Sequence, residues 1–338
     1  MKIVKKSLTL AISVIVLFTG CSGVSTVKKE NTKTNTSIRV VTTYKPATDI
    51  VLALGGMDKL VGANDGAKSD PLLVKLDENM ASKLVEVGSK KNGVNIEQIV
   101  ALKPDVVILY PTKESDDTMK KLTDQNIKVV SINPETIEAL KADIVKVGDA
   151  IEESEKSKEL VAYYKEKIED VTKKVNTVKD KKTVYIAGAH GILSTSSGDF
   201  YQHEMIEVAG GIDVAAKLKG GWNDVSVEQV IAWNPDVIAS VMYCPEGTPT
   251  EIMEKAELQT VGAIKNKTVY QIPSNIAPWD MPQPSSILAI LWMSKTLYPE
   301  EFSDLDIHKV VNEFYSNFYG KSFDELGGTL LGESNTKK

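Results

Sequence analysis

Two segments of this chain, VNIEQIVALKPDVV at 94–107 and VSVEQVIAWNPDVI at 225–238, are nearly the same sequence. Half of the aligned positions are identical, most of the others exchange one apolar residue for another, and the copies start 131 residues apart. In each copy a capping residue, Asn95 or Ser226, precedes a helical stretch, and a Pro-Asp pair ends that stretch before a buried strand. The chain is therefore predicted to contain the same helix–strand unit twice.

The sequence around these copies alternates short apolar runs with helical patterns. Continuous runs such as DVVILY and TVYIAGA are typical of strands that are covered on both faces, which indicates parallel sheets in an α/β fold. Two further anchors recur in the same order. One is a helix closed by Gly-Gly, in LALGGMDKLVGA at 52–63 and IEVAGGIDVAA at 206–216, and the other is NIKVVSI at 126–132 and NKTVYQI at 266–272. We expect two similar α/β lobes.

Residues 135–179 contain no proline and only one glycine, Gly148. Apolar residues in ELVAYYKEKIEDVTKKV recur at helical spacing, with charges opposite, which predicts one long, stiff helix between the lobes. The expected organisation is an N-terminal lobe at 37–152, a connecting helix at 153–179, a C-terminal lobe at 180–320 and a tail at 321–338.

The N-terminus resembles a bacterial lipoprotein signal: MKIVKK is basic, SLTLAISVIVLF is apolar, and Cys21 follows closely. We expect residues 1–20 to be a signal peptide, Cys21 to carry lipid and residues 21–36 to be a flexible tether to the cell membrane. The protein would then work outside the cytoplasm. The alternative is an ordinary secretory signal with an incidental cysteine. If Cys21 is lipidated, Cys244 has no disulfide partner.

Charge and motif content weigh against two classes of function. The net charge is −6 and the lysines are scattered, so no basic face for nucleic acid is expected. The chain has no Gly-x-Ser-x-Gly elbow, P-loop or His-Glu-x-x-His motif, which weighs against an enzyme.

The repeated pattern behind a lipoprotein signal resembles the substrate-binding proteins of ABC importers for iron-siderophore, haem and cobalamin, over residues 38–320. The resemblance implies two Rossmann-like lobes with mostly parallel sheets, joined by one long rigid helix, with the ligand in the cleft between them. It implies a monomer that docks on a permease dimer with its ATPase, through Glu97 and Glu228, one per lobe. From the residues alone, each glutamate could equally serve only to stabilise its helix start.

Ligands in open α/β sheets bind beyond the carboxyl ends of the strands, so side chains in those loops are the candidates. They are heavily aromatic: Tyr44, Asn64, Lys91, Tyr110, His190, Trp222, Tyr243, Trp279, Asp280 and Met281. Tyr110 and Trp222 match places where cobalamin-binding members carry aromatic contacts, although either could be ordinary packing. His190 could be an axial ligand to a bound iron or cobalt complex.

The chain has a single arginine, Arg39, so the cleft lacks the arginines that grip trianionic catecholate siderophores. This favours a flat, less anionic chelate such as haem or a corrinoid, or a siderophore held by Tyr, Trp and Lys. No cofactor is expected, because the metal complex would be cargo. The alternatives are a surface module that senses a ligand and, with less support, an extracytoplasmic enzyme.

Overall fold

The computed structural model describes residues 37–113 and 115–331. The expected signal peptide at 1–20, the lipidated Cys21, the tether at 21–36 and the last seven residues of the tail lie outside the described residues. Within the described part of the chain, none of the helices combines the length and apolarity that a membrane crossing requires.

The first sheet has five parallel strands in the order β3-β2-β1-β6-β7. Its strands are β1 Val40–Thr42, β2 Leu60–Ala63, β3 Val85–Glu86, β6 Val106–Leu109 and β7 Lys128–Ser131. The central strands β1 and β6 are buried along their whole length, as the continuous apolar runs predict.

The second sheet has four parallel strands in the order β10-β8-β12-β13. They are β8 Thr183–Ala187, β10 Ile212–Asp213, β12 Val237–Ser240 and β13 Val269–Gln271. In each of the two sheets the second strand of the sheet in sequence order pairs with the first, and the strand after the repeated segment pairs with the other side of the first. Apart from β3, which has no counterpart in the second sheet, the two sheets share one connectivity, and their parallel strands confirm the predicted fold class.

Helices cover both sheets and also pack on one another. The helices of the first half are α1 Lys45–Ala53, α2 Pro71–Leu76, α3 Glu78–Lys83, α4 Ile96–Ala101, α5 Ser115–Thr123, α6 Ile137–Ala150 and α7 Ser154–Val175. Those of the second half are α8 Tyr201–Val208, α9 Val227–Trp233, α10 Pro249–Met253, α11 Gly262–Lys265, α12 Ser286–Leu297 and α13 Ile307–Tyr319. Two short antiparallel pairs complete the fold: β4 Gly88–Ser89 with β5 Gly93–Val94, and β9 Ser194–Ser196 with β11 Trp222–Asp224.

The repeated segment forms the same structure in both copies. The side chains of Asn95 and Ser226 accept hydrogen bonds from amides in the first turn of the following helix, Gln98 N at 3.0 Å and Gln229 N at 3.1 Å, as a helix N-cap should. The Pro-Asp aspartates have a role that the sequence does not reveal. Asp105 accepts from the amide of Arg39, and Asp236 from the amide of Thr183, both at 2.8 Å. Each aspartate thus fastens the beginning of its lobe's first strand.

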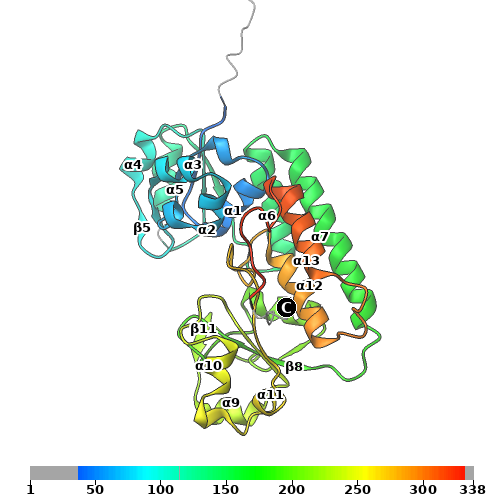
Figure 1. The fold of residues 1–338 in the computed structure, drawn as a ribbon. Coiled ribbons are helices and arrows are strands. Elements are labelled where there is room, and N and C mark those ends of the chain that lie inside the picture. Colours follow the sequence, from blue (N-terminus) through cyan, green and yellow to red (C-terminus); the bar gives the residue numbers. More distant parts are fainter. Residues whose placement is uncertain (1–36, 114, 332–338) are drawn as a thin grey trace, which may run out of the picture. The chain divides into compact units, whose positions relative to one another are not determined.

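Helix α7 is the longest helix in the described part of the chain, and it packs mainly on α6 and α12 (Figure 1). The ring of Tyr163 in α7 contacts the rings of Phe314 and Phe318 in α13, so the C-terminal helix packs against the connecting helix. Helix α13 also contacts α1 of the first lobe. The C-terminal helices therefore form a layer shared by both halves.

Helix α9 of the second copy buries less of its apolar face than helical spacing predicts. The spacing of the second copy predicts Ile231 on the inward face of α9, but its side chain is 38% exposed. Only Val230 of that helix is fully buried, because a helix of seven residues meets the sheet along little more than one turn.

Candidate functional site

A cavity of about 200 Å³ lies where the strand ends of both halves meet. The first half contributes the residue before α1, the first turn of α1, the turn between β4 and β5 and the residue shortly before α6. The second half contributes the start of α8, strand β11 and the loops after β12 and before α12. The lining residues are Tyr44, Lys45, Pro46, Lys90, Glu135, Phe200, Tyr201, Gln202, Trp222, Tyr243, Met281 and Pro282. This is the position that the strand-end rule predicts for a ligand.

The first half supplies a lysine held among tyrosine rings. Lys90 Nζ lies 3.3 Å from the ring centroid of Tyr110 and 5.5 Å from that of Tyr44, and the two rings meet edge to face at 4.9 Å. Glu135 Oε1 lies 3.9 Å from the same ammonium group. Burial lowers the pKa of Lys90, and the Glu135 carboxylate opposes that effect. The cation is thus fixed at the cavity wall by π faces and one acid.

A second lysine, Lys45 at the start of α1, is held by two acids. Its Nζ lies 2.5 Å from Asp70 Oδ2 and 3.3 Å from Asp49 Oδ2. Burial alone would lower the pKa of Lys45, but the two carboxylates outweigh it and raise the pKa. Burial also raises the pKa of Asp49, which is 1% exposed. Lys45 remains charged at the cavity edge while both acids lie behind it.

The second half contributes the opposing aromatic wall. The rings of Phe200 and Trp222 pack edge to face with centroids 6.3 Å apart. Trp222 lies directly on the backbone of Gly188, because a Cβ at that glycine would come within 1.8 Å of Trp222 Cζ3. A glycine in the loop after β8 is therefore what allows the indole to occupy its place.

Behind this wall lies a buried polar cluster. The Tyr243 hydroxyl donates to Asp280 Oδ2 at 2.7 Å, and Gln202 Nε2 donates to the same oxygen at 3.4 Å. Asp280 is fully buried and Gln202 is 3% exposed. Burial raises the pKa of Asp280 to about 6, although the bonds from Tyr243 and Gln202 oppose the rise.

The structure gathers several of the predicted ligand-binding residues at this cavity. Tyr44, Trp222, Tyr243 and Met281 line it directly. Tyr110 contacts Tyr44 and Lys90 at its border, and Asp280 lies beneath it, bonded to Tyr243.

Four predicted residues lie elsewhere. Asn64 is buried and bonded to Thr48 and to the Asp65 carbonyl, and Lys91 is exposed. The side chain of His190 is 59% exposed, and its Nδ1 lies 3.0 Å from Asp224 Oδ1, so it does not line the cavity.

Trp279 is not at the cavity wall, because it is fully buried in the aromatic core. Its Nε1 donates to the Tyr315 hydroxyl at 3.3 Å and its ring contacts Phe323 at 6.1 Å. Residues of α13 and the segment after it cover a proline-flanked loop that the sequence alone suggests is open. Its expected place among the ligand contacts is corrected accordingly.

Residues at the starts of α1 and α8 and just before α6 also line the cavity, although the sequence did not single them out. Phe200, Tyr201, Gln202, Lys45 and Glu135 all line the cavity. These residues lie at or just before the N-termini of helices that follow strands. Because parallel sheets bind ligands at this edge, that position could have identified them from the sequence.

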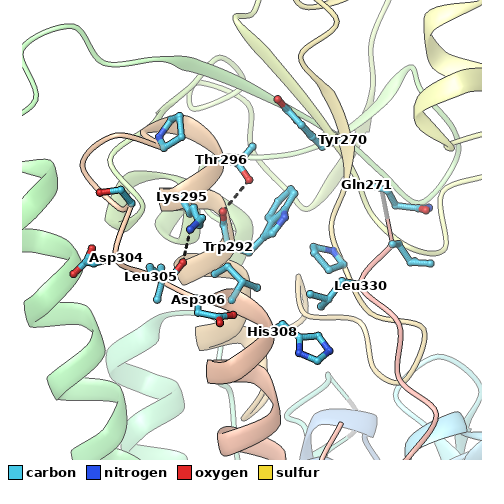
Figure 2. Close-up of a pocket in the computed structure, with 15 residues that line it drawn as sticks. Tyr270, Gln271, Trp292, Lys295, Thr296, Asp304, Leu305, Asp306, His308 and Leu330 are labelled. Carbon is cyan, nitrogen blue, oxygen red and sulfur yellow. Dashed lines mark hydrogen bonds between the residues drawn. The ribbon is translucent and has the colours of Figure 1, made fainter. Parts of the chain in front are cut away.

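A larger cavity, of about 520 Å³, lies away from these residues (Figure 2). It is enclosed by β13, α12, the loop before α13 and residues 330–331. Its lysine, Lys295, donates to the carbonyl of Leu305, and Thr296 donates to that of Trp292 at 2.9 Å. None of the predicted ligand contacts lines this cavity.

Glu97 and Glu228 are both exposed, in the first turns of α4 and α9. Hydrogen bonds from its own backbone amide and from Ser226 lower the pKa of Glu228. Across residues 37–113 and 115–331, no group of three or more His, Cys, Asp or Glu side chains is placed to hold a metal ion.

Comparisons with known proteins agree with this architecture. The family model of periplasmic binding proteins matches residues 40–276. The chain is 32% identical over 254 residues to the molybdate-binding protein MolA of Haemophilus influenzae, an alignment that covers 69% of this chain and 72% of the relative. It is 27% identical to an uncharacterised ABC transporter substrate-binding lipoprotein, YvrC, of Bacillus subtilis, covering 82% and 84%.

A solved structure shows the same fold. The crystal structure of a periplasmic solute-binding protein from Veillonella parvula superposes with a TM-score of 0.77 at 27% identity, covering 87% of this chain and 91% of that one. The chain belongs to the periplasmic binding protein family, the extracytoplasmic solute-binding components of ABC transporters. Its relatives are binding proteins rather than enzymes.

Proposed function

We propose that this chain captures an iron or cobalt chelate, a siderophore complex, haem or a corrinoid, in the cavity between its lobes and delivers it to an ABC permease. The observation that carries the proposal is the convergence of aromatic rings from both halves, Tyr44 on one side and Phe200, Trp222 and Tyr243 on the other, on one cavity. Flat π faces suit a planar, preassembled complex, whose metal needs no further ligands from the protein.

The charges at the cavity suit the edge of such a chelate. Lys90 and Lys45 present ammonium groups that can pair with carboxylate or phenolate oxygens. Neither is an arginine, so bidentate recognition of a highly anionic rim is not favoured. The metal complex would therefore be held mainly by stacking, with few charge contacts.

Delivery would use the two matched acids. Glu97 and Glu228 lie at equivalent places of the two lobes, and both are exposed, as contacts for a permease dimer must be. The exposed Ile231 follows Glu228 by three residues on the same helix and offers an apolar contact beside the acid. We also propose that Cys21 is lipidated and anchors the protein to the membrane.

A small oxyanion is the second candidate. The relative MolA is named for molybdate, and a cavity of about 200 Å³ is small for a complete haem or corrinoid. The aromatic walls favour the chelate, whereas an oxyanion would need donors that converge on it.

Titration of the purified protein separates the two candidates. Tryptophan fluorescence and calorimetry would be followed with haem, cobinamide, cyanocobalamin, ferric hydroxamate and ferric catecholate complexes, and molybdate. Binding of a chelate with Trp222 quenched, and loss of that quenching in Trp222→Phe, supports the proposal. Trp292→Phe is the matched control, because Trp292 lines the other cavity. Tight binding of molybdate with no binding of any chelate would contradict it.

A further inference from the structure

Two buried oxygen atoms beside the cavity have no hydrogen-bond partner among the described residues. They are Gln202 Oε1 and Asp280 Oδ1. Their side chains are bonded to each other, Gln202 Nε2 to Asp280 Oδ2 at 3.4 Å, and Gln202 itself lines the cavity. A buried acceptor without a donor is unfavourable, so two of them in one cluster call for a donor that the described residues do not supply.

The orientation of both groups is fixed by their other bonds. If the Gln202 amide were flipped, its oxygen would face the Asp280 carboxylate and its NH₂ would lose its acceptor. Tyr243 donates to Asp280 Oδ2 at 2.7 Å, which leaves Oδ1 as the oxygen without a partner. The cluster therefore has two acceptor oxygens without a donor, Gln202 Oε1 and Asp280 Oδ1, together with the second N–H of the Gln202 amide.

Asp280 also lacks a cationic partner. No ion pair involving it is present in residues 37–113 and 115–331, whereas the other fully buried acid near the cavity, Asp49, is paired with Lys45. A buried carboxylate without a counter-ion is unfavourable for folding, and such groups concentrate at functional sites.

We propose that Gln202, which lines the cavity, and Asp280, which is hydrogen-bonded to Gln202 behind the cavity wall, form a specificity pocket that accepts hydrogen bonds from an N–H, O–H or ammonium group of the ligand. This inference rests on the proposed function and narrows the class of metal complex that the protein would bind. Among metal complexes, the pocket selects those that carry donors on their periphery, such as amide, amine, hydroxyl or metal-bound water. It also disfavours a fully deprotonated oxyanion, because Asp280 would repel negative charge at that point.

The test is the substitution Asp280→Asn, combined with the same chelate panel and molybdate. Asparagine retains one oxygen for the Tyr243 and Gln202 donors, so its NH₂ takes the place of Oδ1 and converts an acceptor into a donor. The affinity for the donor-bearing chelate is expected to fall by roughly ten- to a hundredfold, as for loss of a hydrogen bond to a charged group. Asp213→Asn is the matched control, a buried acid in the same lobe whose oxygens are already bonded to His203 and to the Ala215 amide.

Gln202→Met provides a second variant, since it removes Oε1 at nearly the same length, and it serves if Asp280→Asn does not fold. Weakened chelate binding in either variant, with Asp213→Asn unchanged, supports the pocket. A chelate that binds the native protein and both variants equally would overturn the pocket and leave the proposed function standing. Binding of molybdate alone, or of no probe at all, would contradict the proposed function and the pocket together.

Discussion

The substitution Asp280→Asn, which is expected to weaken ligand binding, is also expected to make the folded protein more stable. Asp280→Asn removes a fully buried charge that has no cationic partner among the described residues. Burial raises the pKa of Asp280 from 3.8 to about 6. A rise of this size corresponds to about 3 kcal/mol of stability lost when the folded protein must hold the carboxylate ionised.

The sign follows from which state holds the proton more tightly. The pKa of Asp280 is higher in the folded state than in the unfolded chain. The stabilising contribution of the protonated carboxyl group is therefore fully present below about pH 4, the unfolded pKa, and is lost as the pH rises through about 6, the folded pKa. At pH 8 the native protein carries the full cost and the asparagine variant carries none of it. The variant is therefore expected to be more stable by up to about 3 kcal/mol at pH 8 and to match the native protein near pH 4.

Urea unfolding at the two pH values, followed by circular dichroism, measures this difference. Asp213→Asn is the control, because that carboxylate already accepts from His203 Nδ1 at 2.9 Å and from the Ala215 amide at 2.8 Å. Burial raises the pKa of Asp213 as well, but the Ala215 amide and His203 oppose the rise, so its removal is expected to bring a smaller gain than that of Asp280. Equal or lower stability of Asp280→Asn at pH 8 would refute the argument that this charge is uncompensated.

Three further predictions concern docking, the aromatic wall and the core. Alanine at both Glu97 and Glu228 should abolish uptake of the chelate in cells while affinity in solution stays unchanged; lost affinity would assign these acids to the cavity instead. Gly188→Ala should displace the Trp222 ring and weaken chelate binding roughly tenfold, measured by calorimetry, and unchanged affinity would remove the indole from the site. Trp279→Ala should cost about 3–5 kcal/mol in urea unfolding, as for a large core side chain, with ligand affinity retained in the folded fraction.

Much of the fold could be predicted because the chain encodes it twice. The capping residues Asn95 and Ser226 are local signals, and both act as caps in the structure. The apolar runs at 106–109 and 237–240 form the buried strands that follow. Local chemistry determines each of these features, so a single sequence suffices to predict them.

The site was harder to predict, because it depends on which loops the C-terminal helices cover. Trp279 lies in a loop between prolines, a pattern typical of exposed segments, yet α13 and Phe323 enclose it. His190 follows a strand as a ligand-binding residue should, but it turns to Asp224. Gln202 lies on a helix with ordinary amphipathic spacing, and nothing in its neighbours reveals an acceptor without a donor. These properties arise from contacts between residues far apart in the sequence.

The contacts around α8 bear on how far the lobes can move. Glu204 Oε2 accepts from the amide of Ile137 at 2.6 Å, so the second lobe caps the start of α6 in the first. Gln202, two residues earlier, lines the cavity, and Glu135, two residues before Ile137, lines it from the other side. Opening the cavity widely would break a charge-assisted bond worth about 1.5–3 kcal/mol and expose the helix N-terminus. Since this bond lies directly beside the ligand contacts, we expect binding to adjust the cavity by small shifts of side chains around it, with the two lobes remaining joined at α6 and α8.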